Sequence, residues 1–358
     1  MHTKLLAFVV IGLIALAALI PADVLAQDIT LRGRTFYKDG QEWLPKGIKV
    51  EGFARPISPT LPKWANDSSK MTRSWWGLQE INVIKEKFGG TVINLTVSQP
   101  GLDPQSSIYS TDYLAELLDA IKLARSQGLV VILSMDAQAE NGLPNLPCMP
   151  YDSTIRAWKA IEQSLKHDKG IMLEIFNEPC RADSPDGRKT WSQGMQSLID
   201  SLRSDGAENI LLLDGLGFAQ HTDGLFPLVH DRLPNRLAMV VHPYVNSLEH
   251  VDLNHVEDYL GHQFGDTAAK YPIIATEWNA TETNSCVGDA TPTLALTIVR
   301  YLQTRHIGLI GWAIDSEHGK MVKDHVNYEP TDYSTFTACS KTAGVSGAGK
   351  LIAAYPRN

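Results

Sequence analysis

The sequence predicts an α/β protein folded as a (β/α)₈ TIM barrel, in a single domain over residues 27–358 with an N-terminal β-hairpin lid. Two observations predict this fold. Eight short apolar segments are typical of buried strands and begin 28 to 44 residues apart. Helical patterns lie between them, and a repeated strand and helix is typical of a parallel sheet with crossover helices. Eight units favour a closed barrel, with an open doubly wound sheet as the alternative.

The segment before the barrel predicts export. Lys4 precedes an unbroken apolar run over residues 5–20, which is shorter than the about 20 residues that a bilayer span needs. The small residues Val24 and Ala26 then complete a pattern typical of a cleavage site. We expect residues 1–26 to be a signal peptide and the protein to be secreted, extracellular or periplasmic. An uncleaved signal anchor is the alternative.

The expected lid comes next in the chain. A first strand over residues 29–36 is followed by the Asp39-Gly40 turn and a second strand over residues 42–44. The barrel strands then begin near Gly47, Thr91, Leu129, Ile171, Asn209, Leu237, Tyr271 and His306. The clearest helix covers residues 112–127, where five apolar residues form one stripe and Gly128 ends the pattern.

The charge balance excludes some classes of partner. Lys and Arg number 32 against 40 Asp and Glu, so the formal net charge is −8. This charge argues against nucleic acid or an anionic membrane as a partner. The hydrophobic fraction of 44% is that of a globular chain with a large core.

Polar side chains stand where four of the expected strands end, and in such barrels the carboxyl ends of the strands carry the chemistry. These residues are Asn177 and Glu178 after strand four, His242 and Tyr244 after strand six, Glu277 and Trp278 on strand seven, and Trp312 on strand eight. Two carboxylates, an amide and several aromatic rings are therefore expected at one rim.

This arrangement resembles glycoside hydrolase family 5, the cellulase-like retaining TIM-barrel glycosidases. The resemblance rests on I-F-N-E-P on strand four and on I-A-T-E-W on strand seven, 99 residues later, with H-P-Y on strand six and G-W on strand eight. It implies that Glu178 is the acid/base and Glu277 the nucleophile. It also implies that Asn177 bonds the sugar 2-hydroxyl, that Tyr244 bonds the nucleophile, and that His242, Trp278 and Trp312 contribute to the substrate site.

The residue types suit this chemistry. Retaining cleavage needs one protonated carboxyl and one ionised carboxylate about 5 to 5.5 Å apart. Carboxyls this close have different pKa values, which separates their roles. Each residue also has a structural interpretation: Glu178 as a helix cap, Glu277 as a salt-bridge partner, His242 as a core histidine, and the aromatic residues as packing.

Two positions depart from the family pattern. Asn94 stands on strand two where the family has an arginine that holds the nucleophile, and Asp136 ends strand three where it has a histidine. The chain is therefore interpreted as a divergent member. Trp64, Trp75 and Trp76 in the first long loop form either a stacking wall for sugars or a local packing cluster.

Four cysteines remain in the exported part, and none has a zinc-finger spacing. Three pairings are open; we favour Cys148 with Cys180 and Cys286 with Cys339, since each pair would join neighbouring barrel loops. No metal or cofactor is expected, and we expect a monomer.

The sequence thus predicts a secreted endo-β-glycosidase acting on a polysaccharide, with β-1,4-glucan first. An endo-β-mannanase, a wall transglycosylase and a non-catalytic glycan-binding barrel are the alternatives.

Overall fold

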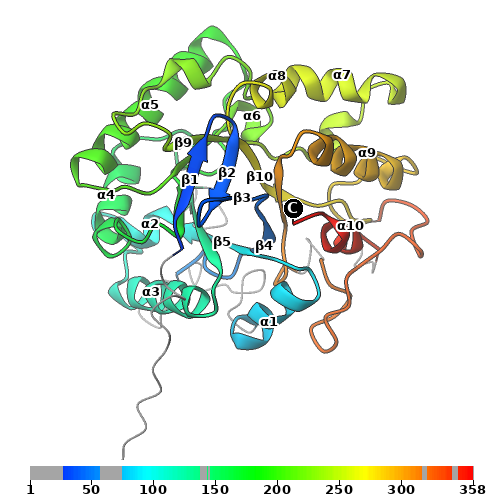
Figure 1. Cartoon of the computed structure of the whole chain (residues 1–358), viewed down its shortest axis with the longest axis horizontal. Helices are drawn as coiled ribbons and strands as arrows, with labels where there is room; N and C mark the ends of the chain where they lie inside the picture. Colours follow the sequence, from blue (N-terminus) through cyan, green and yellow to red (C-terminus); the bar gives the residue numbers. More distant parts are fainter. Residues whose placement is uncertain are drawn as a thin grey trace, which may run out of the picture.

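The computed structural model describes residues 27–56, 75–137, 143, 146–316, 321–340 and 346–357. Eight parallel strands close into a barrel in the order β10-β11-β4-β5-β6-β7-β8-β9, and helices surround them (Figure 1). The predicted (β/α)₈ barrel is therefore confirmed.

All eight predicted barrel strands are present at the expected places. They are β4 (Lys46–Val50), β5 (Val92–Ser98), β6 (Val130–Asp136), β7 (Ile171–Glu174), β8 (Leu211–Asp214), β9 (Leu237–Val240), β10 (Ile273–Trp278) and β11 (Gly308–Gly311).

The longer helices pack around the outside of the barrel (Figure 1). The predicted helix over residues 112–127 is α3, which begins and ends one residue earlier. Ser110 caps it by accepting a hydrogen bond from the Tyr113 amide. The helices are α1 (Leu78–Glu86), α2 (Gln99–Leu102), α3 (Thr111–Ser126), α4 (Asp152–Ile161), α5 (Pro185–Ser204), α6 (Leu216–Ala219), α7 (Val256–Leu260), α8 (Asp266–Ala268), α9 (Thr291–Thr304) and α10 (Gly349–Ala354).

The N-terminal lid has three antiparallel strands instead of the expected two. These are β1 (Ile29–Arg32), β2 (Thr35–Lys38) and β3 (Gln41–Glu42). An additional turn at Gly33, which adopts a φ of 59°, divides the expected first strand. Glycine adopts this left-handed conformation without steric penalty, so the turn forms there.

The lid covers the end of the barrel at which the strands begin. The Ile29 amide donates to the carbonyl of Lys169, just before β7, and Trp43 Nε1 donates to Thr91 Oγ1, just before β5. Phe36 and Trp43 belong to the same apolar cluster as the interior side chains of the barrel. The amino-terminal end of the barrel is thus closed, which leaves the carboxyl-terminal end for the site.

Both expected disulfides are present. Cys148–Cys180 joins the loop after β6 to the loop after β7, and Cys286–Cys339 joins the loop after β10 to the segment 321–340. The first bond lies two residues beyond Glu178, so it ties the loop that carries this glutamate to its neighbour.

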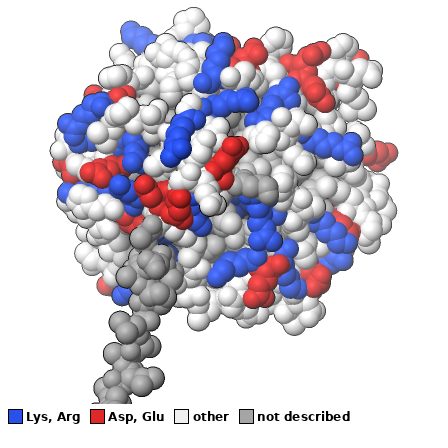
Figure 2. Space-filling model, viewed as in Figure 1, with Lys and Arg blue, Asp and Glu red and all other residues white. Residues whose placement is uncertain are grey.

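Lys, Arg, Asp and Glu side chains are interspersed over the face that carries the lid (Figure 2). Among the residues that the structure describes, no helix is long and apolar enough to cross a membrane. The proposed signal peptide lies outside these residues.

Candidate active site

A layer of buried polar side chains lies inside the barrel, above its apolar interior. Side chains alternate between the two faces of a strand, and this alternation places Ser134 on the same face of β6 as Ile132, and Glu174 on the same face of β7 as Met172. Ile132 and Met172 belong to the apolar cluster that includes the lid. The Ser134 hydroxyl donates to Glu174 Oε1 over 2.9 Å. The interior therefore becomes polar toward the carboxyl ends of the strands.

Glu178 lies in the turn after β7 with its backbone in the left-handed region, at a φ of 51°. Non-glycine residues rarely adopt this conformation, and they do so mostly where the surrounding structure imposes it. Here the Glu178 amide donates to Asp214 Oδ2 over 2.8 Å. The Glu178 side chain is 14% exposed, and its Oε1 lies 2.9 Å from His242 Nδ1.

Glu277 lies on β10 at an irregularity in the strand. The register with β11 shifts between Ala275 and Trp278, which is typical of a β-bulge. The bulge changes the alternation, so Glu277 faces the same site as Glu178. The Glu277 side chain is 11% exposed.

The bulge also explains why Trp278 does not reach the site. Trp278 is fully buried and belongs to the apolar core that includes the helix residues Trp191 and Leu294. Its position therefore does not support the expectation that this ring contacts substrate. Trp278 is a packing residue.

The two glutamates lie close together. The side chains of Glu178, His242 and Glu277 each place one ligand atom within 4.8 Å of the others. A carboxylate oxygen of Glu178 is therefore within 4.8 Å of one from Glu277. Glu178 after β7 and Glu277 on β10, which the sequence predicted at one rim, therefore lie next to each other.

Glu277 is held by two donors. Lys49 on β4 donates from Nζ to Oε2 over 2.7 Å, and the Tyr244 hydroxyl donates to Oε1. Burial alone would raise the pKa of Glu277, but Lys49 and then His242 outweigh it and lower this pKa below its ordinary value. Burial and the neighbouring Glu277 raise the pKa of Tyr244 well above its usual range, so its hydroxyl keeps its proton.

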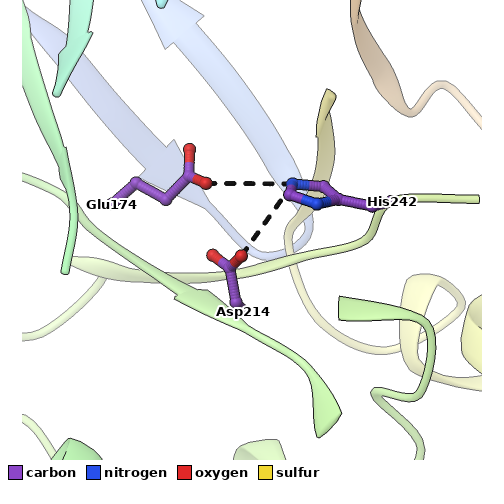
Figure 3. A group of neighbouring side chains, drawn as sticks. All are labelled: Glu174, Asp214 and His242. Atoms are coloured by element: carbon purple, nitrogen blue, oxygen red, sulfur yellow. Dashed lines mark ion pairs between the residues drawn. The ribbon is translucent and has the colours of Figure 1, made fainter. Parts of the chain in front are cut away.

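His242 links Glu178 to a buried acidic group. Its Nε2 lies 3.0 Å from Thr276 Oγ1 and 3.8 Å from both Glu174 Oε1 and Asp214 Oδ2. Figure 3 shows both carboxylates directed at the same edge of the imidazole. Burial would lower the pKa of His242, but attraction to Glu277 and the bond to Glu178 raise it to about 9.

The buried acids differ in their partners. Glu174 accepts from Ser134 and from Asn94 Nδ2, which also donates to the carbonyl of Thr276. Asp214 has one oxygen without a hydrogen-bond partner. Burial, followed by repulsion from Glu174, raises the pKa of Asp214 well above its ordinary value.

Asn94 and Asp136 occupy the two places where the family pattern differs. Asn94 is fully buried and contacts Glu174, so it does not replace an arginine beside Glu277. Asp136 ends β6 and is 5% exposed. The cation beside Glu277 comes instead from Lys49, a residue that the sequence analysis missed.

Trp312 follows β11 and is half-buried, with its indole N–H donating to Glu51 Oε1 over 2.6 Å. Thr96 Oγ1 donates to the same oxygen over 2.9 Å. Burial raises the pKa of Glu51 to about 8, against the opposing effect of Lys49. Glu51 is a third acid at this rim, and it too was missed.

The aromatic residues of the first long loop have packing partners where they are described. Trp75 stacks on His325 with ring centroids 3.6 Å apart, and Trp76 packs edge-on against Phe53. These contacts favour the packing interpretation for both rings. Trp64 lies outside the described residues.

Two groups of side chains have the ligand types for a cation, namely Glu174, Asp214 and His242, and Glu178, His242 and Glu277. Most of their ligand atoms already have hydrogen-bond or ion-pair partners within the protein. We therefore interpret both groups as one network that positions carboxylates.

The closed barrel, with two adjacent carboxylates at the carboxyl ends of its strands, defines the class of barrel glycoside hydrolases. A family model described as cellulase (glycosyl hydrolase family 5) matches residues 50–318. The chain belongs to glycosyl hydrolase family 5. No curated protein sequence matches it significantly.

Solved structures show the same fold. A β-glucanase from Saccharophagus degradans in complex with cellotetraose has a TM-score of 0.65 at 18% identity, over 86% of this chain and 91% of that one. An endocellulase from Pyrococcus horikoshii has a TM-score of 0.63 at 13% identity, over 83% and 94%. The endoglucanase catalytic domain of Thermobifida fusca has a TM-score of 0.61 at 14% identity, over 91% and 96%.

Proposed function

We propose that this glycoside hydrolase is a secreted, retaining endo-β-glycosidase that cleaves β-linked polysaccharide. β-1,4-Glucan is the favoured substrate, and β-mannan is the second candidate. The short separation of Glu178 and Glu277 carries the proposal. Retaining enzymes hold their carboxyls about 5 to 5.5 Å apart, whereas inverting enzymes need about 6.5 to 9.5 Å for a water molecule. Oxygens within 4.8 Å of each other fit retention. The similar structures include a β-glucanase and an endoglucanase that are each in complex with cellotetraose, which favours a glucan.

In the first step Glu277 attacks the anomeric carbon. A bond forms from its carboxylate to that carbon while the bond to the leaving oxygen breaks, and Glu178 gives its proton to that oxygen. The lowered pKa of Glu277 keeps it ionised for the attack.

In the second step a water molecule takes the place of the leaving group. Glu178, now a carboxylate, accepts a proton from this water as its oxygen bonds to the anomeric carbon. The ester bond to Glu277 breaks, and the product keeps its original anomeric configuration.

His242 Nδ1 lies 2.9 Å from Glu178 Oε1. This contact holds the Glu178 carboxyl in place for the proton transfer of the first step.

Asn177 and Trp312 bind the sugar in this proposal. Asn177 donates to the 2-hydroxyl, and the Trp312 ring lies under the apolar face of the sugar whose bond is cleaved. Trp278 is left out because it is buried in the core.

Two variants test the assignment. Glu277→Gln should abolish turnover, because an amide cannot form the ester. Glu178→Ala should slow turnover by about 10²- to 10⁴-fold, and added azide should restore it as a glycosyl azide of retained configuration. Wild-type activity in either variant would refute the assignment.

Residues 1–26 are proposed as the cleaved signal peptide, and residues 27–358 as one monomeric catalytic domain. Mass spectrometry of the exported protein tests the first statement, and its sedimentation tests the second.

A further inference from the structure

A fully buried lysine lies at the centre of the site. Lys49 has no exposed side-chain area, and its ammonium group contacts two side chains that the proposed mechanism uses. Nζ lies 2.7 Å from Glu277 Oε2 and 3.2 Å from Asn177 Oδ1. A buried charge is unfavourable unless it is paired, so this lysine needs its partners and also fixes them.

The hydrogen bond from Lys49 determines how the side-chain amide of Asn177 is oriented. Oδ1 accepts a hydrogen bond from Lys49 Nζ over 3.2 Å and also lies 3.1 Å from Ser134 Oγ. The ammonium group of Lys49 can only donate, so it requires the oxygen at this position, and the amide nitrogen must point away from it. Nδ2 is therefore left as a donor for the sugar.

Among the described residues, Lys49 is the cation that hydrogen-bonds Glu277, and His242 adds a second positive charge within 4.8 Å. The strand-two position contributes Asn94, which is neutral and bonds Glu174 and the Thr276 carbonyl. Lys49 lies on the neighbouring strand, at a position paired with Asn94 in the register of β4 and β5.

We propose that Lys49 is a positioning residue that aligns the nucleophile Glu277 and, through the same ammonium group, orients Asn177 toward the 2-hydroxyl of the substrate. It supplies from β4 the positive charge that the neutral Asn94 on β5 does not. The inference rests on the proposed function, because it assigns Lys49 a role in that reaction.

The chain offers a matched control. Lys46 lies on the same strand and is also buried, but its Nζ donates to the carbonyls of Ala353 and Tyr355, away from the site. Lys46→Met and Lys49→Met each remove one buried ammonium group from β4, but only Lys49→Met removes it from the site. Both proteins are first compared by thermal unfolding. If Lys49→Met does not fold, Lys49→Gln replaces it in the pH measurement below, because it removes the charge while its amide can still donate to Glu277; an unmoved acid limb in Lys49→Gln would then overturn the inference.

The first measurement is the rate at which 2,4-dinitrophenyl 2-deoxy-2-fluoro-β-cellobioside labels Glu277, followed by peptide mass spectrometry. Lys49→Met should slow labelling by about 100-fold, as expected when a reacting group is misplaced by about 1 Å. Lys46→Met should label at the wild-type rate. An equal rate in Lys49→Met would overturn the inference.

The second measurement is the acid limb of kcat/KM for 4-nitrophenyl β-cellobioside. Loss of Lys49 should move this limb up by about 1 to 3 pH units, because an adjacent positive charge lowers the pKa of a carboxyl by that amount. Lys49→Arg should return the limb toward its wild-type position. The other titratable groups around Glu277 are unchanged in these variants: Glu51, Glu174, Glu178, His242 and Tyr244.

The third measurement compares kcat/KM for 4-nitrophenyl β-cellobioside with kcat/KM for its 2-deoxy analogue. If Lys49 orients Asn177, removing the 2-hydroxyl should slow Lys49→Met by a smaller factor than it slows the wild type. Equal factors, with an unmoved acid limb, would show that Lys49 only stabilises the fold. Failure to label Glu277 in the wild type would instead refute the proposed function, and with it this inference.

Discussion

Substitutions at the end of the barrel that carries the lid should lower the stability of the fold without changing the rate of catalysis. A buried ion pair at this end tests the expectation. Arg203 lies in the last turn of α5 with its side chain 2% exposed, and the side chain of Asp231 is 3% exposed. The guanidinium donates from Nη2 to Oδ2 over 2.7 Å and from Nε to Oδ1 over 3.0 Å. Asp231→Asn keeps the size of the side chain but leaves the arginine charge buried without its counter-ion.

The expected loss of stability follows from this burial. Removing one partner of a buried pair destabilises a protein by about 3 to 5 kcal/mol. In a domain of this size about 2 °C corresponds to 1 kcal/mol, so Tm should fall by about 6 to 10 °C. At temperatures where the variant is folded, kcat/KM should equal that of the wild type, since Arg203 and Asp231 precede strands β8 and β9 and lie far from their carboxyl ends.

The control is an exposed pair with the same chemistry. Lys87 and Glu329 are 2.5 Å apart, with side chains 33% and 61% exposed. Glu329→Gln should leave Tm unchanged within error, because exposed ion pairs contribute little. Differential scanning calorimetry measures both variants. Equal Tm values for Asp231→Asn and Glu329→Gln would refute the reasoning.

Three further predictions concern the rim. Burial raises the pKa of Glu51 to about 8, so its ionisation destabilises the folded protein as pH rises from about 4.5 through 8. Glu51→Gln should therefore have a higher Tm than the wild type at pH 9 but not at pH 4. A Tm difference that is the same at both pH values would contradict this. Tyr244→Phe removes a donor to Glu277 and should move the acid limb of kcat/KM up by about 0.5 to 1 pH unit, which a pH–rate profile measures. Replacing Cys148 and Cys180 by serine opens a loop with a sequence separation of 32 and should destabilise the fold by about 3 to 4 kcal/mol, which calorimetry detects as a lower Tm.

Much of the fold could be predicted because strands buried on both faces are nearly continuous apolar runs. The strand near Ile171 and the strand near Tyr271 were placed in this way, and with them Glu178 and Glu277 at their ends. The lid was predicted less well, since a single Gly33 within a strand pattern is compatible with either a bulge or a turn.

The sequence analysis expected Trp278 at the site and missed Lys49 and Glu51, and the reasons differ. Trp278 was expected at the site because it stands at the end of strand seven, but a bulge between Ala275 and Trp278 turns Glu277 to the site and Trp278 to the core. No residue type marks this bulge in the sequence. Lys49 was missed because a lysine within G-I-K-V-E-G-F is ordinarily a solvent-facing side chain.

A signal for Lys49 was nevertheless present. Ile48 and Val50 belong to the core between the strands and the helices, so alternation directs Lys49 into the barrel. A positive charge inside a barrel needs a carboxylate partner. Its pairing specifically with Glu277 depends on the closed strand order, in which β4 follows β11 and β10.

The stereochemical course of hydrolysis tests the central claim most directly. Cellopentaose is added to the enzyme, and proton NMR follows the anomeric signals of the new reducing ends before mutarotation mixes them. The proximity of Glu178 and Glu277 predicts that the β-anomer appears first. Initial formation of the α-anomer would mean inversion and would contradict the assignment of Glu277 as nucleophile.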